Sequence, residues 1–438
     1  MYRINHADIK KWAAEYKGEL FDAVLCDPPY EISFMQKSWD GSGIAHDVEM
    51  WADIYKLLKP GGHLLAFSGS RTYHRMAVAI EDAGFEIRDQ IIWMYGSGFP
   101  KSLNIGKAVD KIQGNEREDL GVKTSSSYPD SDGVAHYKNR SQSKGSQVNT
   151  VGMPRITKGT SEWEGYGTAL KPAHEPCVLA RKPLDGTVAN NCLKWGTGGL
   201  NIDGSRVAGK PWASVAPNKG GRSGGVMGKQ TTHPGGEPNA LGRFPANLIL
   251  SDDPEVEAVF PQTTSAKAGF TPRTGGNVYG GNALLSSKTI HQGGMEYGDS
   301  GSASRYFYCA KASKSERNAG LEGLPDIEQH GHYAQDEWSR QNMGNTPDAK
   351  REPTKNNHPT VKPLSLTKYL ANLIKPPTGG RLLVPFSGSG SEMIGALQAG
   401  WEYVEGVELT EEYIPIAEAR IKYWLEKLEE ESKQVSLI

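Results

Sequence analysis

Residues 27–30 of the chain, Asp-Pro-Pro-Tyr, directly follow an apolar run at 21–26, FDAVLC. The apolar run predicts a buried strand. Beside prolines with fixed φ angles, the carboxylate of Asp27 and the carbonyl of Pro28 are acceptors with preset directions, and prolines add no competing N–H. Tyr30 offers a flat face on which a ligand can stack. The alternative is a proline-terminated strand with an Asx-type turn, which the first three residues also fit.

A second group, Phe386 to Gly390 (FSGSG), lies where another apolar run gives way to a helical pattern. Glycines allow a sharp turn and close approach to a ligand, and the helix N-terminus offers unpaired N–H groups. Glu408, about eighteen residues on, closes the next predicted strand and is placed to accept hydrogen bonds from ribose hydroxyls. A phosphate loop and the GxGxxG pattern are both absent, which favours a nucleoside-bearing ligand without a pyrophosphate. A tight structural turn is the alternative.

Strand and helix signals alternate in the two parts of the chain that carry these groups. The predicted strands are 21–27, 63–70, 86–100, 381–386 and 403–409. The predicted helices are 45–62, which Pro60, Gly61 and Gly62 terminate, 72–85, which Gly84 closes, 103–114, 391–400 and 411–431. This alternation indicates a parallel, doubly wound α/β sheet, whose strands present their carboxyl ends to a ligand cleft.

The composition of the 438 residues, with 37% hydrophobic and 23% charged, is typical of a globular protein. The net charge of −2 does not itself indicate a nucleic-acid binder, although a whole-chain sum can hide a basic face. Four scattered cysteines without CxxC spacing predict a reducing compartment and no metal site. No apolar run approaches membrane-spanning length and no signal peptide is evident, so we expect no membrane partner and a cytoplasmic location.

DPPY and PFSGSG together resemble the motifs of amino-group DNA methyltransferases that use S-adenosylmethionine (SAM). The catalytic tetrapeptide precedes the cofactor turn, as in the circularly permuted beta class of that family. Residues 358–374, HPTVKPLSLTKYLANLI, are similar to the family segment that closes over the methionine part of the cofactor. The stretches GYGTALKPAHEP, RYFYCAKAS and NNHPTVKP are similar to enzymes of bacteriophages and prophages.

The resemblance implies a Rossmann-like doubly wound methyltransferase sheet, circularly permuted, with a loop-rich target-recognition insertion. It implies SAM as cofactor, no metal, and double-stranded DNA as partner, and it leaves monomer or homodimer undecided. The implied catalytic residues are Asp27, Pro28, Pro29 and Tyr30. The implied cofactor-binding residues are Asp8, His358, Thr360, Lys362, Pro385, Phe386, Ser387, Gly388, Ser389, Gly390, Glu408 and Leu409.

Some positions depart from the family pattern or have a second interpretation. Val384 stands where the family usually has an acid, and Ser391 where threonine is common. Lys362 is expected to bind the cofactor carboxylate, or else to be solvated. Asp8, expected near the cofactor adenine, equally fits a helix N-cap. Cys26 is expected to be a small buried residue rather than a nucleophile.

In the implied chemistry, the exocyclic amine of adenine is a poor nucleophile that must be held in line with a sulfonium methyl group. Asp27 accepts one N–H and the carbonyl of Pro28 the other, while the face of Tyr30 stacks on the extruded base. The rival activities are methylation of cytosine at N4, which in this family usually goes with Ser before Pro-Pro, and a catalytically silent DNA-binding relative.

We expect five segments: the catalytic half, a polar flexible insertion, a sheet-edge strand (HEPCVLARK) of the catalytic domain, a target-recognition region and the cofactor-binding half. Their ranges are 1–112, 113–164, 165–189, 190–304 and 305–438. The recognition region has a local excess of basic residues that suits a phosphate backbone, and amides that can reach base edges. The basic residues are Arg206, Lys210, Lys219, Arg222, Lys229 and Arg243, and the amides Asn201, Asn218, Gln230 and Asn239. A solvated insertion is the alternative. A solitary phage or restriction-modification enzyme is the implied biological setting.

Overall fold

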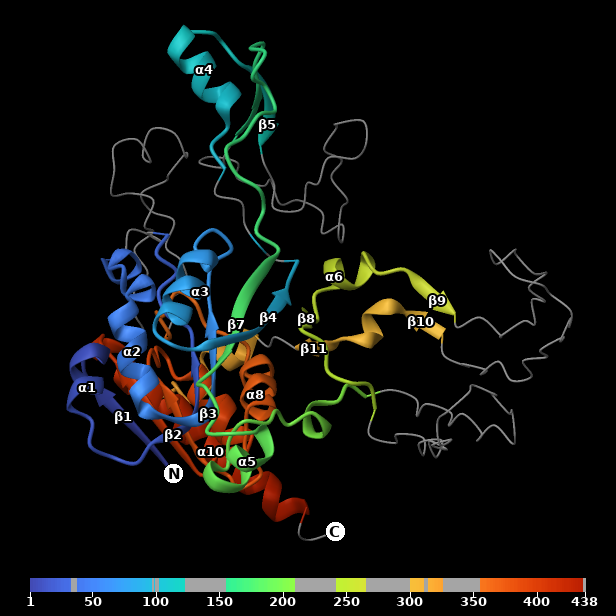
Figure 1. Cartoon of the computed structure of the whole chain (residues 1–438). Coiled ribbons are helices and arrows are strands. Elements are labelled where there is room, and N and C mark those ends of the chain that lie inside the picture. Colours follow the sequence, from blue (N-terminus) through green and yellow to red (C-terminus); the bar gives the residue numbers. More distant parts are fainter. Residues whose placement is uncertain are drawn as a thin grey trace, which may run out of the picture.

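The computed structural model describes residues 1–32, 38–96, 98, 102–122, 155–208, 242–264, 300–310, 314–325 and 355–435. A nine-stranded sheet forms its centre (Figure 1). Its strands are β1 (Tyr2–His6), β2 (Phe21–Cys26), β3 (Leu58–Phe67), β4 (Glu86–Met94), β7 (His174–Arg181), β8 (Leu248–Ser251), β11 (Tyr308–Ala310), β12 (Arg381–Val384) and β13 (Tyr403–Glu408). Their order is β1-β13-β12-β2-β3-β7-β4-β8-β11. Neighbours are parallel except where β7 pairs with β3 and β4.

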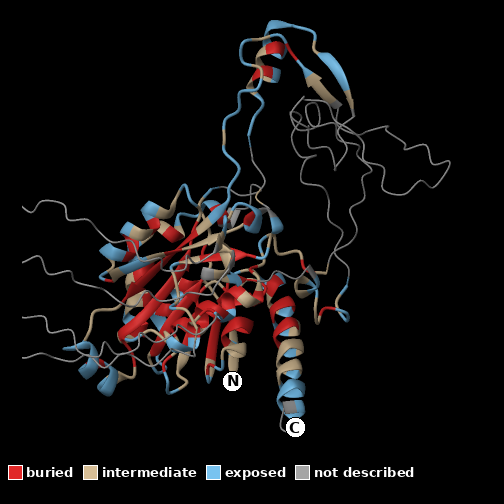
Figure 2. Ribbon diagram, turned by 90° about the vertical axis from the view of Figure 1, so that its right-hand side faces the viewer, coloured by how far each residue is buried: buried red, intermediate tan, exposed pale blue. Residues whose placement is uncertain are grey.

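Helices cover both faces of the sheet. They are α1 (Ile9–Glu15), α2 (Val48–Leu57), α3 (Tyr73–Asp82), α8 (Leu364–Leu373), α9 (Ser391–Gln398) and α10 (Ile414–Val435). Successive side chains of a strand point to opposite faces, and β2 displays this rule. Ala23 and Leu25 pack with α8, α9 and α10, whereas Val24 and Cys26 pack with α1, α2 and α3. The central strands are therefore buried on both sides (Figure 2).

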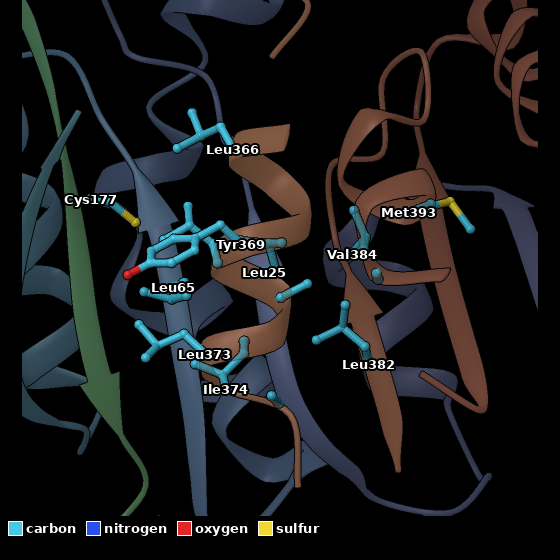
Figure 3. Packing of buried hydrophobic residues seen from close by; sticks show 14 of the residues in the cluster. Leu25, Leu65, Cys177, Leu366, Tyr369, Leu373, Ile374, Leu382, Val384 and Met393 are labelled. Carbon is cyan, nitrogen blue, oxygen red and sulfur yellow. The ribbon is translucent and has the colours of Figure 1, made fainter. Parts of the chain in front are cut away.

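Helix α8 lies directly on the sheet next to α9. Its residues Leu366, Tyr369 and Leu373 face Leu25, Leu65 and Leu382 of three strands (Figure 3). Gly395 of α9 permits this packing, because a Cβ there would come within 2.3 Å of Thr367 Oγ1 on α8. The close contact fixes the segment that precedes α8 relative to the turn that precedes α9.

The predicted doubly wound α/β fold is confirmed, but the sheet is mixed and β7 is not at an edge. The expected edge position of HEPCVLARK was wrong, because β7 lies between β3 and β4 and is antiparallel to both. The chain leaves β4, runs through a long excursion and returns beside its starting point, where Tyr95 N–H donates to the carbonyl of Ala173 (2.9 Å). Strands β4 and β7 are thus the two sides of a long hairpin.

The excursion forms an arm that projects from the sheet (Figure 1). It carries α4 (Ile105–Gln113) and the antiparallel pair β5 (Glu118–Val122) and β6 (Arg155–Lys158). Arg117 ties the arm together by pairing with Asp110 and with Glu164. The expected flexible insertion at 113–164 therefore has ordered ends, and its part at 123–154 lies outside the described residues.

Three further expectations need correction. The helix expected at 45–62 ends at Leu57, and β3 begins at Leu58, so that the Pro-Gly-Gly sequence lies within the strand. There Gly61 N–H donates to the carbonyl of Lys182 (3.1 Å). The region 190–304, which we expected as a segment of its own, contributes a strand to the central sheet, because β8 pairs with β4. Strand β1 was not predicted, and it extends the sheet beyond β13.

Helix α5 (Val188–Trp195) leads into the region 190–304, which also contains α6 (Pro254–Ala258) and the antiparallel pair β9 (Gln262–Thr264) and β10 (Ser300–Ser302). The described residues expected to contact DNA have structural partners. Arg206 pairs with Asp203 at 2.7 Å, and Arg243 donates to the carbonyl of Arg305 at 3.0 Å. Asn201 donates to Asn372 at 3.2 Å. The other seven named for this role are Lys210, Asn218, Lys219, Arg222, Lys229, Gln230 and Asn239, all outside the described residues.

Candidate active site

The two sequence groups meet where the strand order of the sheet changes direction. Strands β12 and β2 are parallel neighbours, with Leu382 opposite Ala23. From β12 the chain passes through α9 to β13 on one side, and from β2 it passes through α2 to β3 on the other. Such a switch point leaves a crevice beyond the carboxyl ends of the two strands. The segments 27–30 and 385–390 both lie at this crevice, although the chain between them exceeds three hundred residues.

Asp27 presents one engaged and one unengaged oxygen. Its Oδ2 accepts a hydrogen bond from Lys362 Nζ at 2.6 Å. Its Oδ1 is buried and has no hydrogen-bond partner among the described residues. A buried acceptor without a donor is costly. Asp27 Oδ1 therefore remains open as an acceptor, and its role toward a ligand N–H stays a prediction.

Tyr30 is fixed at both ends. Thr72 Oγ1 donates to its carbonyl at 2.6 Å, and its own hydroxyl donates to Glu175 Oε2 at 2.9 Å. Burial and the neighbouring carboxylates, first Asp27, raise the pKa of this phenol well above its ordinary value, so it remains a donor. The next residue, Glu31, has φ of 55°, and its carboxylate accepts from Gly43 N–H at 2.7 Å. A left-handed non-glycine residue held in this way marks a constrained turn.

Lys362 connects the catalytic turn to two other parts of the chain. Its ammonium contacts Asp27 Oδ2, the Tyr30 hydroxyl at 3.0 Å and Glu175 Oε2 at 3.2 Å. Burial alone would lower its pKa, but Asp27 and Glu175 outweigh burial and hold the pKa above its ordinary value. The solvated alternative is excluded, because Lys362 is only 6% exposed. An ammonium has three N–H donors, and Asp27 and Tyr30 accept two of them, so binding of the cofactor carboxylate by Lys362 stays a prediction.

The glycine turn after β12 is closed by its own backbone. The N–H of Gly390 donates to the carbonyl of Ser387 at 2.7 Å, and Ser387 N–H donates to Val407 of β13 at 2.9 Å. Gly388 and Gly390 have φ of 48° and 84°. These are left-handed conformations that favour glycine. Pro385 and Phe386 lead from the strand into this turn.

Arg420 of α10 supports the turn from behind and was not predicted. Its side chain is fully buried and donates to the carbonyl of Ser389 at 2.5 Å, to Ser389 Oγ at 3.0 Å and to Ser391 Oγ at 3.2 Å. Burial lowers the pKa of Arg420 to about 10, which still leaves it charged at neutral pH. The turn is therefore held by a buried guanidinium as well as by its glycines.

Glu408, predicted to bind ribose hydroxyls, lies at the end of β13 beside the turn. Its Oε2 accepts from Gly388 N–H at 2.7 Å and its Oε1 from Thr410 N–H at 2.8 Å. A carboxylate oxygen has two lone pairs, so each keeps capacity for a ligand. Leu409 follows and is 59% exposed.

Asp8 caps helix α1, as its second interpretation stated. Its Oδ1 accepts from Lys11 N–H at 3.1 Å. Strand β1, which precedes it, pairs with β13 so that His6 lies opposite Glu408. Asp8 therefore follows the neighbouring strand end at the same edge of the sheet, and its role near an adenine stays a prediction.

His358 lies against the glycine turn. A Cβ on Gly388 would come within 2.8 Å of its Nε2. The distance from Nδ1 to the carbonyl of Thr360 is 2.5 Å, which requires an Nδ1–H donor. Burial lowers the pKa of His358 to about 4, so the ring is neutral at physiological pH. Thr360 contributes this carbonyl, and its side chain is exposed.

Neither a membrane span nor a metal centre is found in the described part of the chain. None of the described helices combines the length and apolar character needed to cross a bilayer. The described residues contain no group of three His, Cys, Asp or Glu side chains that could hold a metal ion. A hollow of about 360 Å³ lies between α1 and the first residues of β12 and β13, and none of the predicted site residues lines it.

Comparison with known proteins gives a family for part of the chain. Residues 21–184 match the N6_N4_Mtase family, described as DNA methylase. The Type II methyltransferase M2.LlaDCHI of Lactococcus lactis subsp. cremoris is 24% identical over 212 residues, which is 43% of this chain and 73% of that protein.

Solved structures of low similarity were also found. The M1.HpyAVI–SAM complex matches with a TM-score of 0.37 and 14% identity, covering 96% of this chain and 99% of that one. The cytosine-N4-specific PvuII DNA methyltransferase matches with a TM-score of 0.41 and 10% identity, covering 96% of this chain and 86% of that one.

Proposed function

We propose that this chain, whose residues 21–184 match the N6/N4 DNA methylase family, transfers a methyl group from SAM to the N6 amino group of an adenine in double-stranded DNA. The observation that carries the proposal is the buried and unpartnered Oδ1 of Asp27, in a crevice that it shares with a glycine turn. A carboxylate oxygen without a donor suits an amino group that must give up a proton in the reaction.

The residues at the crevice suit SAM, which supplies a methyl group on a positively charged sulfur. Asp27, Glu175 and Glu392 bring three carboxylates to the site, against two cations, the ammonium of Lys362 and the guanidinium of Arg420. A cationic ligand is favoured by this imbalance. The turn at 386–390 and Glu408 would hold the nucleoside part, and Asp8 lies on the neighbouring strand end.

The chain's own groups would position the amine for attack. Asp27 Oδ1 accepts one N–H and the Pro28 carbonyl the other, and these bonds stabilise the charge that develops on nitrogen. Pro29 fixes the turn so that the ring face of Tyr30 can stack on a base extruded from the duplex. Lys362 and Glu175 hold Asp27 and Tyr30 in place through the contacts described above.

Adenine is favoured over cytosine by one residue. The resemblance associates Asp before Pro-Pro with adenine N6 and Ser with cytosine N4, and this chain has Asp27. Methylation of cytosine N4 is the second candidate, because the matched family covers both bases.

The test is to express the chain in a host that lacks DNA methylation and to measure the modified bases by mass spectrometry of the hydrolysed DNA. We expect N6-methyladenine with the wild type and none with Asp27→Ala. N4-methylcytosine instead would overturn the adenine assignment. Absence of both bases, together with no heat on titration of the purified chain with SAM, would favour a silent DNA-binding relative.

A further inference from the structure

Glu392 is a buried acid at the crevice that takes no part in the methyl transfer itself and has no assigned ligand group. It is the second residue of α9, directly after the glycine turn, and is 4% exposed. Among the described residues, no side chain donates a hydrogen bond to its carboxylate. The hydrogen bond that it receives comes from its own backbone N–H. The buried carboxylate therefore keeps open acceptor positions, which suit a cationic ligand that brings N–H donors.

The charged groups around Glu392 come from three elements. Asp27 follows β2, Lys362 precedes α8 and Arg420 lies on α10, while the thiol of Cys26 is also close enough to interact. Burial, followed by the repulsion of Asp27, raises the pKa of Glu392 to about 7. The two cations lower this pKa too little to offset burial, so the carboxylate is poised between its two protonation states near neutral pH.

Neither cation donates a hydrogen bond to Glu392 in the contacts of the described residues. The ammonium of Lys362 contacts Asp27, Tyr30 and Glu175. The guanidinium of Arg420 donates to oxygens of the turn and to the carbonyl of Glu316 at 3.3 Å. The buried Nε of Arg420 has no hydrogen-bond partner, yet no hydrogen bond joins it to Glu392. We therefore expect a ligand to supply the further donors for this carboxylate.

The end of strand β12 supplies no acid either. Val384 is fully buried and packs in the core beneath α8 (Figure 3). Glu392 on the helix side is thus the carboxylate next to the turn, whereas Glu408 lies at the end of β13 and already accepts two backbone N–H groups.

We propose that Glu392 binds the α-ammonium group of the methionine part of SAM. This inference rests on the proposed function, which brings SAM to the crevice. The ammonium is chosen over the sulfonium because only the ammonium carries N–H donors, and a buried carboxylate needs donors as well as a positive charge.

Three ligands separate this role from a general effect on binding. SAM and S-adenosylhomocysteine both carry the ammonium, whereas 5′-methylthioadenosine keeps the nucleoside and sulfur but lacks the amino-acid part. Isothermal titration of Glu392→Gln should show affinities for the first two weakened about 10- to 100-fold, the range for a hydrogen bond to a charged group. The affinity for 5′-methylthioadenosine should stay within about twofold.

The pH dependence gives a second readout. The ammonium favours the ionised carboxylate, so binding to the wild type must release a proton below the pKa of about 7. Affinity for SAM should therefore rise between pH 6 and pH 8 in the wild type, and this rise should be absent in Glu392→Gln. Glu392→Asp, which keeps the charge on a shorter side chain, should retain the rise with weaker binding.

Glu405→Gln is the matched control, because Glu405 is 3% exposed and lies on β13, near its amino end. It should leave all three affinities unchanged. Glu392→Gln removes a buried charge, so we expect its melting temperature at pH 8 to equal or exceed that of the wild type. Wild-type affinity for SAM in Glu392→Gln, with the pH dependence intact, would overturn the inference and leave the proposed function standing. Failure of the wild type to bind any of the three ligands would instead remove the proposed function.

Discussion

The two sides of the crevice are built in different ways. On the cofactor side, the turn at 386–390 is closed by its own backbone, by the neighbouring Glu408 and by the buried Arg420. On the catalytic side, Asp27 depends on Lys362 and keeps one oxygen without a partner. On the cofactor side, hydrogen bonds engage most backbone groups of the turn, and we call this turn with Glu408 and Arg420 the cradle. On the catalytic side, a network of charged side chains leaves one acceptor, Asp27 Oδ1, without a partner.

This difference separates binding from chemistry. A cradle made of backbone groups holds a ligand by shape, and its strength depends on glycine conformations and on supporting bonds. A side-chain network with an unpaired acceptor stores an unfavourable interaction that a substrate can relieve. Changes on the cofactor side should therefore affect ligand affinity and folding, and changes on the catalytic side should mainly affect turnover.

Replacing Asp27 should have the largest effect. In Asp27→Ala the acceptor for the amine is lost, and we expect kcat to fall by about 10³-fold or more. The affinities for SAM and DNA should stay within severalfold of the wild type, because the cofactor turn is untouched. Transfer of radiolabelled methyl groups, titration with SAM and a gel-shift assay measure the three quantities.

Two further variants sharpen this test. Asp27→Asn keeps an oxygen at the site but loses the charge that pairs with Lys362, so its kcat should lie between those of the wild type and Asp27→Ala. Asp22→Asn changes a buried acid at the other end of β2. It should lower stability without lowering the kcat of the folded enzyme. Turnover like that of the wild type in Asp27→Ala would end the proposed mechanism.

Removing the support behind the turn should come next in size. Arg420→Met leaves the carbonyl of Ser389 and two serine hydroxyls without their donor. We expect the free energy of unfolding to fall by about 3 kcal/mol, as for buried groups left unpaired. Urea unfolding measures this loss, and titration should show weaker SAM binding in the variant that remains folded.

Arg420→Lys is the matched control. It keeps a positive charge but cannot reach several oxygens at once, because the planar fork of arginine is lost. Its stability should lie between those of the wild type and Arg420→Met. Equal stability of all three proteins would show that the cradle does not depend on this residue.

The sequence predicted the cofactor side better than the catalytic side, because the signals of the cofactor side are local. Strand, turn, helix and Glu408 follow one another within residues 381–408. By contrast, Lys362 and Asp27 are 335 positions apart, and Tyr30 and Glu175 are 145 apart. Sequence reasoning gives no register over such separations. It identified Lys362 but not its contacts with Asp27 and Tyr30, and it missed Glu175.

Arg420 and Glu392 did carry a signal. Ile416, Ala417 and Ile421 form a buried stripe at helical spacing on α10, and Arg420 falls on the same stripe. Glu392 is the one acid in the helix SEMIGALQ. A charged residue on a predicted apolar face must find a partner inside the protein or on a ligand. The sequence pattern therefore indicates that Arg420 and Glu392 each have a buried partner or ligand, but it does not identify that partner.

Changing Glu175 should have an intermediate effect, on turnover rather than on binding. In Glu175→Gln an acceptor remains for Tyr30, but Lys362 loses one of its two carboxylates. We expect kcat to fall about tenfold, the equivalent of one charge-assisted contact. Affinity for SAM should change little.

Tyr30→Phe tests whether Glu175 acts through Tyr30. It removes the hydroxyl that donates to Glu175 and keeps the ring face. If the two residues act as one unit, the kcat of the double variant should fall by a smaller factor than the product of the two single-variant factors. Factors that multiply in the double variant would contradict this network.

The smallest predicted effect is a pH dependence of stability on the cofactor side. His358 has a folded pKa of about 4, against an ordinary value of 6.5, because burial disfavours its charged form. Between these values the unfolded chain binds a proton that the folded chain does not, so the free energy of unfolding should fall as the pH drops from 6.5 towards 4. The slope from one histidine is at most about 1.4 kcal/mol per pH unit. His63 on β3 also has a pKa lowered to about 4 by burial and contributes in the same direction.

The variants His358→Gln and His63→Gln test this pH dependence. Each should reduce the difference in the free energy of unfolding between pH 4.5 and pH 7, measured by urea unfolding. Only His358→Gln should also weaken SAM binding, because only His358 lies against Gly388. Equal SAM affinities in the two variants would show that His358 does not contribute to SAM binding.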